Sequence, residues 1–218
     1  MNKRNKGEIK AVIFDLDGVL TDTAEYHYQS WKKLAQEEGI SFTREDNEQL
    51  RGVTRRQSLE ILLKGKTLPE DKMEELMVKK NEYYQELINN ITEGDLLPGV
   101  ENLLNQLQEE GYKLAVASAS RNARTVIENL GIGKKFQLIA DGYSVKNNKP
   151  APDLFLYAAE ELEVEPEECI VIEDAESGIE AALAAGMHTV GIGPEERVGQ
   201  ADFRYDKIKD IKLADIVK

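Results

Sequence analysis

The sequence lacks the cysteines from which a disulfide could form. Cys169 is its only cysteine, so an intrachain disulfide is impossible. A chain of this kind is typical of a reducing compartment, and we therefore expect a cytoplasmic protein. Because Cys169 opens the apolar segment Cys-Ile-Val-Ile, we expect it to be a small core residue rather than a nucleophile.

Long apolar runs and an excess of basic residues are also absent. No run approaches the roughly 18 apolar residues of a membrane helix, and the polar, basic residues 1–10 do not resemble a secretory signal. Lys and Arg number 28 against 41 Asp and Glu, which gives a net charge of -13. Nucleic-acid binding needs a surplus of basic residues, so we expect no nucleic-acid partner and no membrane partner. An anionic substrate must then be attracted by local cations.

Short apolar strands alternate with amphipathic helices along most of the chain. We predict strands at 10–15, 113–117, 136–140, 169–172 and 188–192, with helices at 100–110, 122–130, 154–162 and 177–185 between them. This alternation predicts an α/β fold with a doubly wound, Rossmann-like parallel sheet. For residues 201–218 the pattern leaves an edge strand and a short helix as alternatives.

The segment between the first two predicted strands contains only helical patterns. They cover residues 23–38, 44–50, 54–63 and 69–91. We therefore predict a core domain of residues 1–21 and 95–218 that carries an inserted α-helical cap domain, residues 22–94. A chain of 218 residues is long enough for both. We expect a monomer.

Polar residues follow three of the predicted strands. Asp15 and Asp17 end the first, Ser118 follows the second, and the pair Glu173-Asp174 follows the strand at 169–172. Strand carboxyl ends meet at one edge of a parallel sheet, where ligands bind. Four carboxylates there repel each other unless a cation is present, and oxygen ligands favour magnesium. Lys149, in a proline-rich loop, is placed to reach the same edge and neutralise phosphate, so the set indicates phosphoryl transfer.

These motifs resemble the four signature motifs of the haloacid dehalogenase superfamily. Within it, the segment from Asp15 through His27, together with Ser118-Ala-Ser-Arg-Asn122 and Lys149-Pro-Ala-Pro-Asp153, is similar to the β-phosphoglucomutase family. The resemblance covers residues 10 to about 195. It implies an isomerase that interconverts β-D-glucose 1-phosphate and D-glucose 6-phosphate through an aspartyl-phosphate enzyme and β-glucose 1,6-bisphosphate.

The resemblance also implies roles for individual residues. Asp15 would be the nucleophile and Asp17 the general acid and base, while Ser118 and Lys149 would stabilise the transferring phosphoryl group. Mg²⁺ would be held by Asp15, the backbone carbonyl of Asp17, Glu173 and Asp174. Sugar phosphate would be bound by residues of the cap and of the segment after Ala117: Thr23, His27, Trp31, Arg51, Gly52, Val53, Arg55, Ser58, Lys80, Ala119, Ser120 and Asn122.

Two positions depart from the family pattern. Ala175 stands where a serine is expected, which removes one hydroxyl near the metal, and Arg51 stands where a lysine is usual. Ordinary structural roles also remain open for some of the residues. His27 alone is compatible with an ordinary helical histidine, Trp31 with packing inside the cap, and Arg55 with a solvated helix charge.

Two other classes of function share the same motifs. A magnesium-dependent phosphatase of this superfamily, acting on a small sugar phosphate or on phosphoglycolate, would use the same core with water as the acceptor. A phospho-accepting signalling domain also combines an aspartate, magnesium, a hydroxyl and a lysine on a doubly wound sheet. The helical insert after the first strand argues against this last alternative, because receiver domains have no such insert.

Overall fold

The computed structural model describes residues 8–50 and 53–217. Its sheet contains six strands: β1 (Ala11–Phe14), β2 (Lys113–Ala117), β3 (Leu138–Ala140), β4 (Cys169–Glu173), β5 (His188–Ile192) and β6 (Phe203–Tyr205). They are arranged in the order β3-β2-β1-β4-β5-β6, and every neighbouring pair is parallel. All four residues of the central strand β1 are buried, with Val12 opposite Leu114 on one side and Ile170 on the other.

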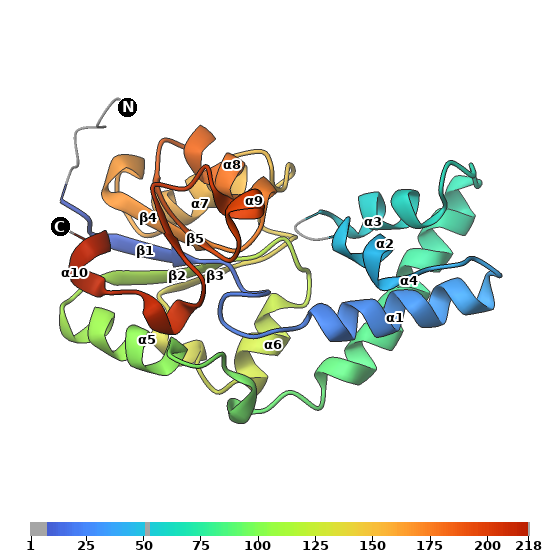
Figure 1. The fold of residues 1–218 in the computed structure, drawn as a ribbon, viewed down its shortest axis with the longest axis horizontal. Helices are drawn as coiled ribbons and strands as arrows, with labels where there is room; N and C mark the ends of the chain where they lie inside the picture. The colour runs from blue at the N-terminus through green and yellow to red at the C-terminus, as the bar shows by residue number, and fades with distance from the viewer. Residues whose placement is uncertain (1–7, 51–52, 218) are drawn as a thin grey trace.

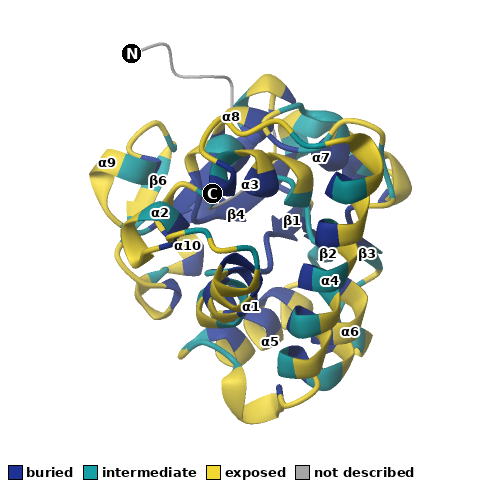
Figure 2. Ribbon diagram, turned by 90° about the vertical axis from the view of Figure 1, so that its right-hand side faces the viewer, coloured by how far each residue is buried: buried dark blue, intermediate teal, exposed yellow. Residues whose placement is uncertain are grey.

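Helices cover both faces of this sheet (Figure 1). One face packs against α5 (Val100–Glu109), α6 (Ala123–Asn129) and α10 (Leu213–Ile216), and the other against α7 (Asp153–Glu161) and α8 (Glu176–Ala184). The short helix α9 (Glu195–Val198) follows β5. Figure 2 shows the buried strands in dark blue, enclosed by helices whose outer faces are exposed. Two apolar layers therefore hold β1 rigidly in the middle of the fold.

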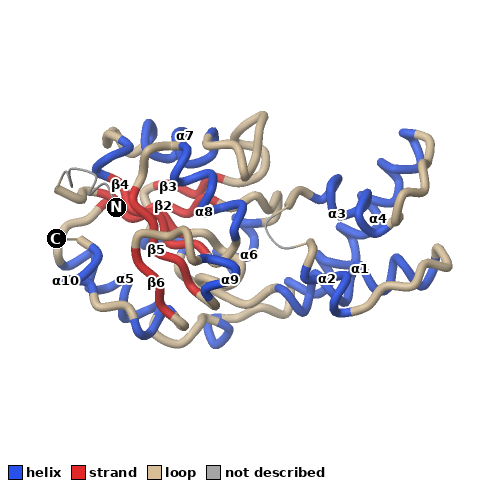
Figure 3. Tube along the Cα trace, turned by 45° about the horizontal axis from the view of Figure 1, so that its top comes forward, coloured by secondary structure: helices blue, strands red, loops and turns tan. Residues whose placement is uncertain are grey.

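Between β1 and α5, the described part of the chain forms four α-helices: α1 (Ala24–Glu37), α2 (Arg44–Glu48), α3 (Arg55–Leu62) and α4 (Glu70–Ile88). They have an apolar cluster of their own, in which Trp31, Leu34 and Leu59 are almost fully buried. In Figure 3 the strands gather in one half of the molecule and these helices make up the other half. We call α1–α4 the cap. Among the described residues, no helix is long and apolar enough to span a membrane.

The predicted fold class is confirmed, and most predicted elements lie within a few residues of the observed ones. The two alternatives for residues 201–218 both occur, because this segment contains the edge strand β6 and the helix α10. In the described part of the chain there are also four short 3-10 helices: Glu93–Asp95, Gly133–Lys135, Pro166–Glu168 and Ile208–Asp210. The division at residues 21/22 and 94/95 stays a prediction.

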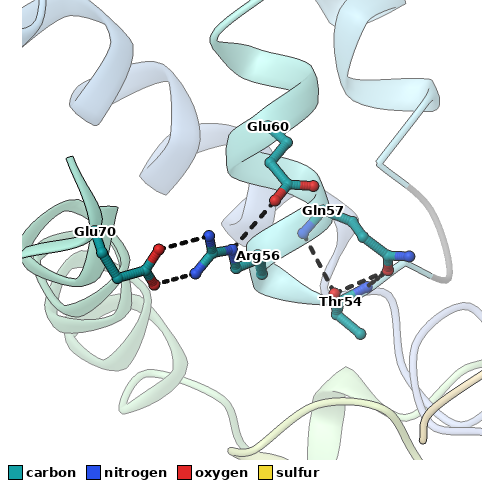
Figure 4. Close-up of polar contacts among 5 residues, drawn as sticks. All are labelled: Thr54, Arg56, Gln57, Glu60 and Glu70. Atoms are coloured by element: carbon teal, nitrogen blue, oxygen red, sulfur yellow. Dashed lines mark hydrogen bonds and ion pairs between the residues drawn. The ribbon is translucent and has the colours of Figure 1, made fainter. Parts of the chain in front are cut away.

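Polar contacts fix the start of α3 and join it to α4 (Figure 4). The Thr54 hydroxyl accepts a hydrogen bond from the Gln57 N–H, and the Gln57 side chain accepts one from the Thr54 N–H at 2.9 Å. Arg56 forms ion pairs with Glu60 on its own helix and with Glu70 at the start of α4. Capping contacts between residues close in the sequence thus fix the N-terminus of α3, the helix that carries Arg55.

We expect Thr54→Ala to lower the free energy of unfolding by about 1 kcal/mol, because it leaves an N-terminal N–H of α3 without an acceptor. Urea denaturation of the variant and the wild type measures this difference. Thr54→Ser, which keeps the hydroxyl, is the matched control and should unfold close to the wild type. Equal stability of the alanine variant would contradict the role of the cap hydroxyl.

Candidate active site

The strands β1 and β4 lie side by side at the point where the sheet reverses its order, and their carboxyl ends carry the first groups of the site. Asp15 directly follows β1, and Glu173 is the last residue of β4. Between them lies the ammonium group of Lys149, with Nζ 2.5 Å from Asp15 Oδ1 and 2.8 Å from Glu173 Oε2. The predicted convergence of these groups at one sheet edge is therefore confirmed in the fold.

A third carboxylate completes a cluster at this edge. Single carboxylate oxygens of Asp15, Glu173 and Asp174 lie within 4.8 Å of one another, and all three residues are buried. Gly18 faces Asp174, and a Cβ at this position would lie 2.4 Å from Asp174 Oδ2, so only glycine fits there. The donors are all hard oxygens, which suits a hard divalent cation such as magnesium.

Electrostatics at the cluster are dominated by burial. Burial and the negative charge of Asp15 raise the pKa of Glu173 to about 8, although Lys149 opposes the shift. Burial lowers the pKa of Lys149, but the neighbouring carboxylates of Asp15 and Glu173 outweigh it and leave that pKa above its usual value. Lys149 is thus a permanent cation at neutral pH, held where a phosphoryl group would meet Asp15.

The Asp17 carboxylate is bound by a residue on the cap side of the cleft. It accepts a hydrogen bond from the Thr23 hydroxyl, which lies just before α1. Burial, and then the charge of Asp15, raise the pKa of Asp17 to about 6, while Thr23 and Lys149 lower it. Two carboxyl groups two residues apart therefore have different environments, and a carboxyl group with a pKa near neutrality can both donate and accept a proton.

A second buried basic side chain lies on the cap side of the cleft. Lys80 Nζ, on α4, is 2.9 Å from His27 Nδ1 on α1. Burial lowers the pKa of His27 well below its usual value, with a further contribution from Lys80, and burial and then the charge of Arg55 lower the pKa of Lys80 well below its usual value. The contact between Nζ and Nδ1 therefore joins two buried basic side chains. The His27 ring stacks on Tyr84, with centroids 4.2 Å apart. The i, i+4 spacing of Thr23 and His27 thus places both toward the cleft.

Arg55 reaches from α3 toward the core through Asn81. Its Nη2 donates to Asn81 Oδ1 at 2.8 Å, and the same oxygen accepts from Asn122 Nδ2, a core residue, at 2.9 Å. Burial, and then the positive charge of Arg121, lower the pKa of the Arg55 guanidinium. Two guanidinium groups therefore face one cleft, an arrangement that favours an anion between them.

The segment after β2 supplies hydroxyl and N–H groups to the same cleft. The Ser118 hydroxyl is buried and accepts a hydrogen bond from the Ser120 N–H at 3.1 Å, and the Ser120 hydroxyl accepts from the Asn122 N–H at 3.2 Å. The turn therefore carries several polar groups within one short segment. Such groups are suited to bind the oxygens of a phosphate.

These groups line one cavity of about 680 Å³ between the cap and the sheet edge. Every candidate residue of the sequence analysis that the structure describes lies on its wall: Asp15, Asp17, Thr23, His27, Trp31, Val53, Arg55, Ser58, Lys80, Ser118, Ala119, Ser120, Asn122, Lys149, Glu173 and Asp174. Arg51 and Gly52 lie outside the described residues. Trp31 is also part of the cap's apolar cluster, so it packs as well as lines the cavity. The roles assigned to these residues stay proposals.

Several polar residues on or near the cavity wall escaped the sequence analysis, and three of them make contacts that matter for the site. Asn81 links the cap to the core, Arg121 lines the cavity beside Ser120, and Arg197 Nη2, on α9, lies 3.8 Å from Asp174 Oδ2. Arg121 could have been found, because it lies inside the Ser118–Asn122 motif. Asn81 and Arg197 carry no local signal, since their contacts arise only when distant helices pack together.

Ala175 lacks the hydroxyl that a serine would have, but its backbone is engaged at the cluster. Its N–H donates to Glu173 Oε1 at 3.0 Å, beside the Asp174 N–H at 3.1 Å. The two N–H groups and Lys149 thus bind both oxygens of Glu173. Glu173 is held firmly without the serine.

Comparisons with known proteins agree with this geometry. β-Phosphoglucomutase of Bacillus subtilis is 46% identical over 94% of this chain and 92% of its own length. A crystal structure of β-phosphoglucomutase from Clostridium difficile superimposes with a TM-score of 0.91 at 43% identity, covering 95% of each chain. The phosphorylated carbohydrates phosphatase of Thermotoga maritima is 32% identical over 84% of each chain. The model of the haloacid dehalogenase-like hydrolases matches residues 12–192, and the chain belongs to this family.

Proposed function

We propose that this enzyme interconverts β-D-glucose 1-phosphate and D-glucose 6-phosphate through β-glucose 1,6-bisphosphate. One observation carries the proposal: a single cavity holds Lys149 beside the nucleophile candidate Asp15, and also Arg55 of the cap together with Arg121 of the core segment after β2. A bisphosphate needs a site for each of its phosphates. The likeness to β-phosphoglucomutases over nearly the whole chain supports the same activity.

In this proposal Asp15 and Asp17 divide the chemistry between them. The Asp15 carboxylate attacks phosphorus and becomes the aspartyl phosphate, while Lys149 neutralises the phosphoryl oxygens. Asp17 protonates the departing sugar oxygen, or removes the proton from the attacking sugar hydroxyl in the other direction. Thr23 holds the Asp17 carboxylate at the cap side, which is where the sugar would lie.

Magnesium would be held by Asp15, Asp174 and the backbone carbonyl of Asp17, with Glu173 beside it. Bound there, the ion would neutralise charge on the phosphoryl oxygens and keep Asp15 ionised. The set of three clustered carboxylates supports this assignment. Lys149 contacts Asp15 and Glu173, and a divalent cation would further reduce the repulsion among the three clustered carboxylates.

The second phosphate would bind to Arg55, Ser120 and Asn122. The bridge Arg55–Asn81–Asn122 supports this, because it joins cap and core at one point of the cavity. The bisphosphate has to turn over between the two half-reactions, so the cap has to open and close on the core. His27 and Lys80 would couple closure of the cap to the position of Asp17, because Lys80 lowers the pKa of the Asp17 carboxyl group.

We expect Asp17→Asn to lower kcat by about 10²- to 10⁴-fold, because an amide can neither donate nor accept the proton. The new side chain keeps an oxygen that accepts from Thr23, and the backbone carbonyl at this position remains, so the fold and Mg²⁺ affinity should change little. Steady-state kinetics and calorimetric titration with Mg²⁺ measure the two quantities. A variant with wild-type kcat would contradict the assignment of Asp17.

The proposed activity is tested by supplying β-glucose 1-phosphate, Mg²⁺ and a trace of β-glucose 1,6-bisphosphate. Glucose 6-phosphate formation, followed by coupling to glucose-6-phosphate dehydrogenase, is the expected result, with a rate that depends on the bisphosphate primer. A matched reaction with α-glucose 1-phosphate is the control for the anomer. Failure to form glucose 6-phosphate from the β-anomer would overturn the proposal.

A sugar-phosphate phosphatase is the second candidate. The 32% identity to the phosphorylated carbohydrates phosphatase favours it, because the two functions differ only in whether a sugar or water accepts the phosphoryl group. We further propose a cytoplasmic location, which the buried free thiol of Cys169 supports. The monomeric state stays a prediction that sedimentation would test.

A further inference from the structure

Tyr143 is a large side chain that the fold leaves in solvent. It is 69% exposed, although it belongs to the loop between β3 and Lys149, which lies at the mouth of the cavity. Single exposed apolar side chains are common on protein surfaces, so exposure alone assigns Tyr143 no role. The contacts of its backbone and its ring carry the inference.

The backbone of Tyr143 is fixed by a turn. Asp141 Oδ1 accepts from the Tyr143 N–H at 2.9 Å, and Asp141 Oδ2 accepts from Arg124 Nε at 3.1 Å. The Gly142 N–H donates to the Ser120 carbonyl at 3.1 Å, and a Cβ on Gly142 would lie 2.5 Å from the Ala119 carbonyl oxygen. The turn therefore packs closely against the segment after β2 that contains the candidate phosphate-binding residues. This packing fixes the position of Tyr143 relative to that segment.

The ring of Tyr143 stacks on Arg121. The guanidinium carbon lies 4.8 Å from the ring centroid, within the range of a cation–π contact. Arg121 is an exposed residue with a long side chain that has several rotatable bonds. The contact with the Tyr143 ring therefore restricts the directions in which its guanidinium group points. The Arg121 side chain lines the same cavity as Ser120 and Asn122.

Arg121 and Arg55 face the same part of the cleft without a counter-anion. Within residues 8–50 and 53–217, neither guanidinium forms an ion pair with a carboxylate. Their charges nevertheless interact, because the pKa of Arg55 is lowered by burial and then by Arg121, and raised by Tyr143. Like charges held together in this way are stabilised when an anion such as phosphate binds between them.

We propose that Tyr143 is a positioning residue, which holds Arg121 toward Arg55 so that the two guanidiniums grip the phosphate farther from Asp15. The inference rests on the proposed function, in which a sugar phosphate spans the cavity. Tyr143 acts through Arg121 and does not touch the reacting atoms, so it affects affinity for the substrate more than the rate of phosphoryl transfer.

The test uses glucose 6-phosphate as the probe, because calorimetry measures its dissociation constant without turnover. Tyr143→Ala should raise this constant about three- to fivefold, the loss expected for an exposed cation–π contact. Tyr143→Phe keeps the ring and should bind like the wild type. Steady-state kinetics should show the same increase in KM for β-glucose 1-phosphate with kcat within about twofold of the wild type.

A double-mutant cycle separates positioning from a general structural effect. In an Arg121→Ala background, Tyr143→Ala should have no further effect on the dissociation constant. Leu156→Ala, which removes another exposed apolar side chain outside this cavity, is the matched control and should bind glucose 6-phosphate like the wild type.

Three results would overturn the inference: unchanged affinity in Tyr143→Ala, an effect of Tyr143→Ala that persists without Arg121, or a wild-type protein that does not bind glucose 6-phosphate. Failure of the proposed function is distinguishable from these, because it would show as glucose 6-phosphate binding without mutase turnover in the wild type.

Discussion

Asp15→Asn should fold like the wild type and lower kcat by about 10⁴-fold or more, because an amide cannot accept a phosphoryl group from the substrate. The amide is isosteric, and Lys149 keeps Glu173 as its partner, so the fold has no reason to change. A stopped assay with β-glucose 1-phosphate measures the loss, and circular dichroism checks the fold.

The covalent intermediate gives this prediction a second readout. Wild-type protein quenched in acid during turnover should carry one phosphoryl group, which hydroxylamine removes because an aspartyl phosphate is an acyl phosphate. Asp15→Asn should carry none, whereas Asp71→Asn, on the exposed surface of α4, should be phosphorylated like the wild type. Phosphorylation or substantial turnover of Asp15→Asn would remove Asp15 as the nucleophile.

Lys149→Met should lower the free energy of unfolding by about 3–5 kcal/mol in the absence of divalent metal. The ammonium group is buried between Asp15 and Glu173, and its removal leaves two buried carboxyl groups without their cation. Turnover should also fall sharply, since the phosphoryl oxygens lose a positive partner. Urea denaturation with a chelator present measures the stability.

Magnesium should narrow the stability difference between Lys149→Met and the wild type, because the ion and the ammonium group neutralise the same carboxylates. Lys134→Met, at an exposed position of the core, is the matched control and should stay within about 0.5 kcal/mol of the wild type. A Lys149→Met protein as stable as this control in chelator would contradict the electrostatic account of the cluster.

Most of the candidate catalytic residues at the sheet edge could be predicted from the sequence, because short local patterns identify the strands that they follow. Asp15 ends an apolar strand, Glu173 ends another, and the alternation of helices and strands places both at one edge. Lys149 could also be predicted to reach this edge, since only one loop connects β3 to α7. For these residues the order of the strands determines where the side chains lie, so a sequence pattern of a few residues is enough to predict that they meet.

The residues that were missed depend on how separate segments pack. Asn81 bonds Asn122, 41 positions away, only because α4 leans on the segment after β2. Arg197 approaches Asp174 because α9 returns over the end of β5, where Gly193 leaves room for the guanidinium. The alternatives for 201–218 were open for a related reason, since a three-residue edge strand such as β6 has too few positions to show a period.

The most direct test of the central claim is to identify the acceptor of the phosphoryl group. Phosphorus-31 NMR follows β-glucose 1-phosphate, glucose 6-phosphate, the bisphosphate and inorganic phosphate in one reaction with Mg²⁺. We predict that glucose 6-phosphate accounts for nearly all the substrate consumed, with the bisphosphate present throughout and little inorganic phosphate. Stoichiometric release of inorganic phosphate without glucose 6-phosphate would contradict the claim and identify water as the acceptor.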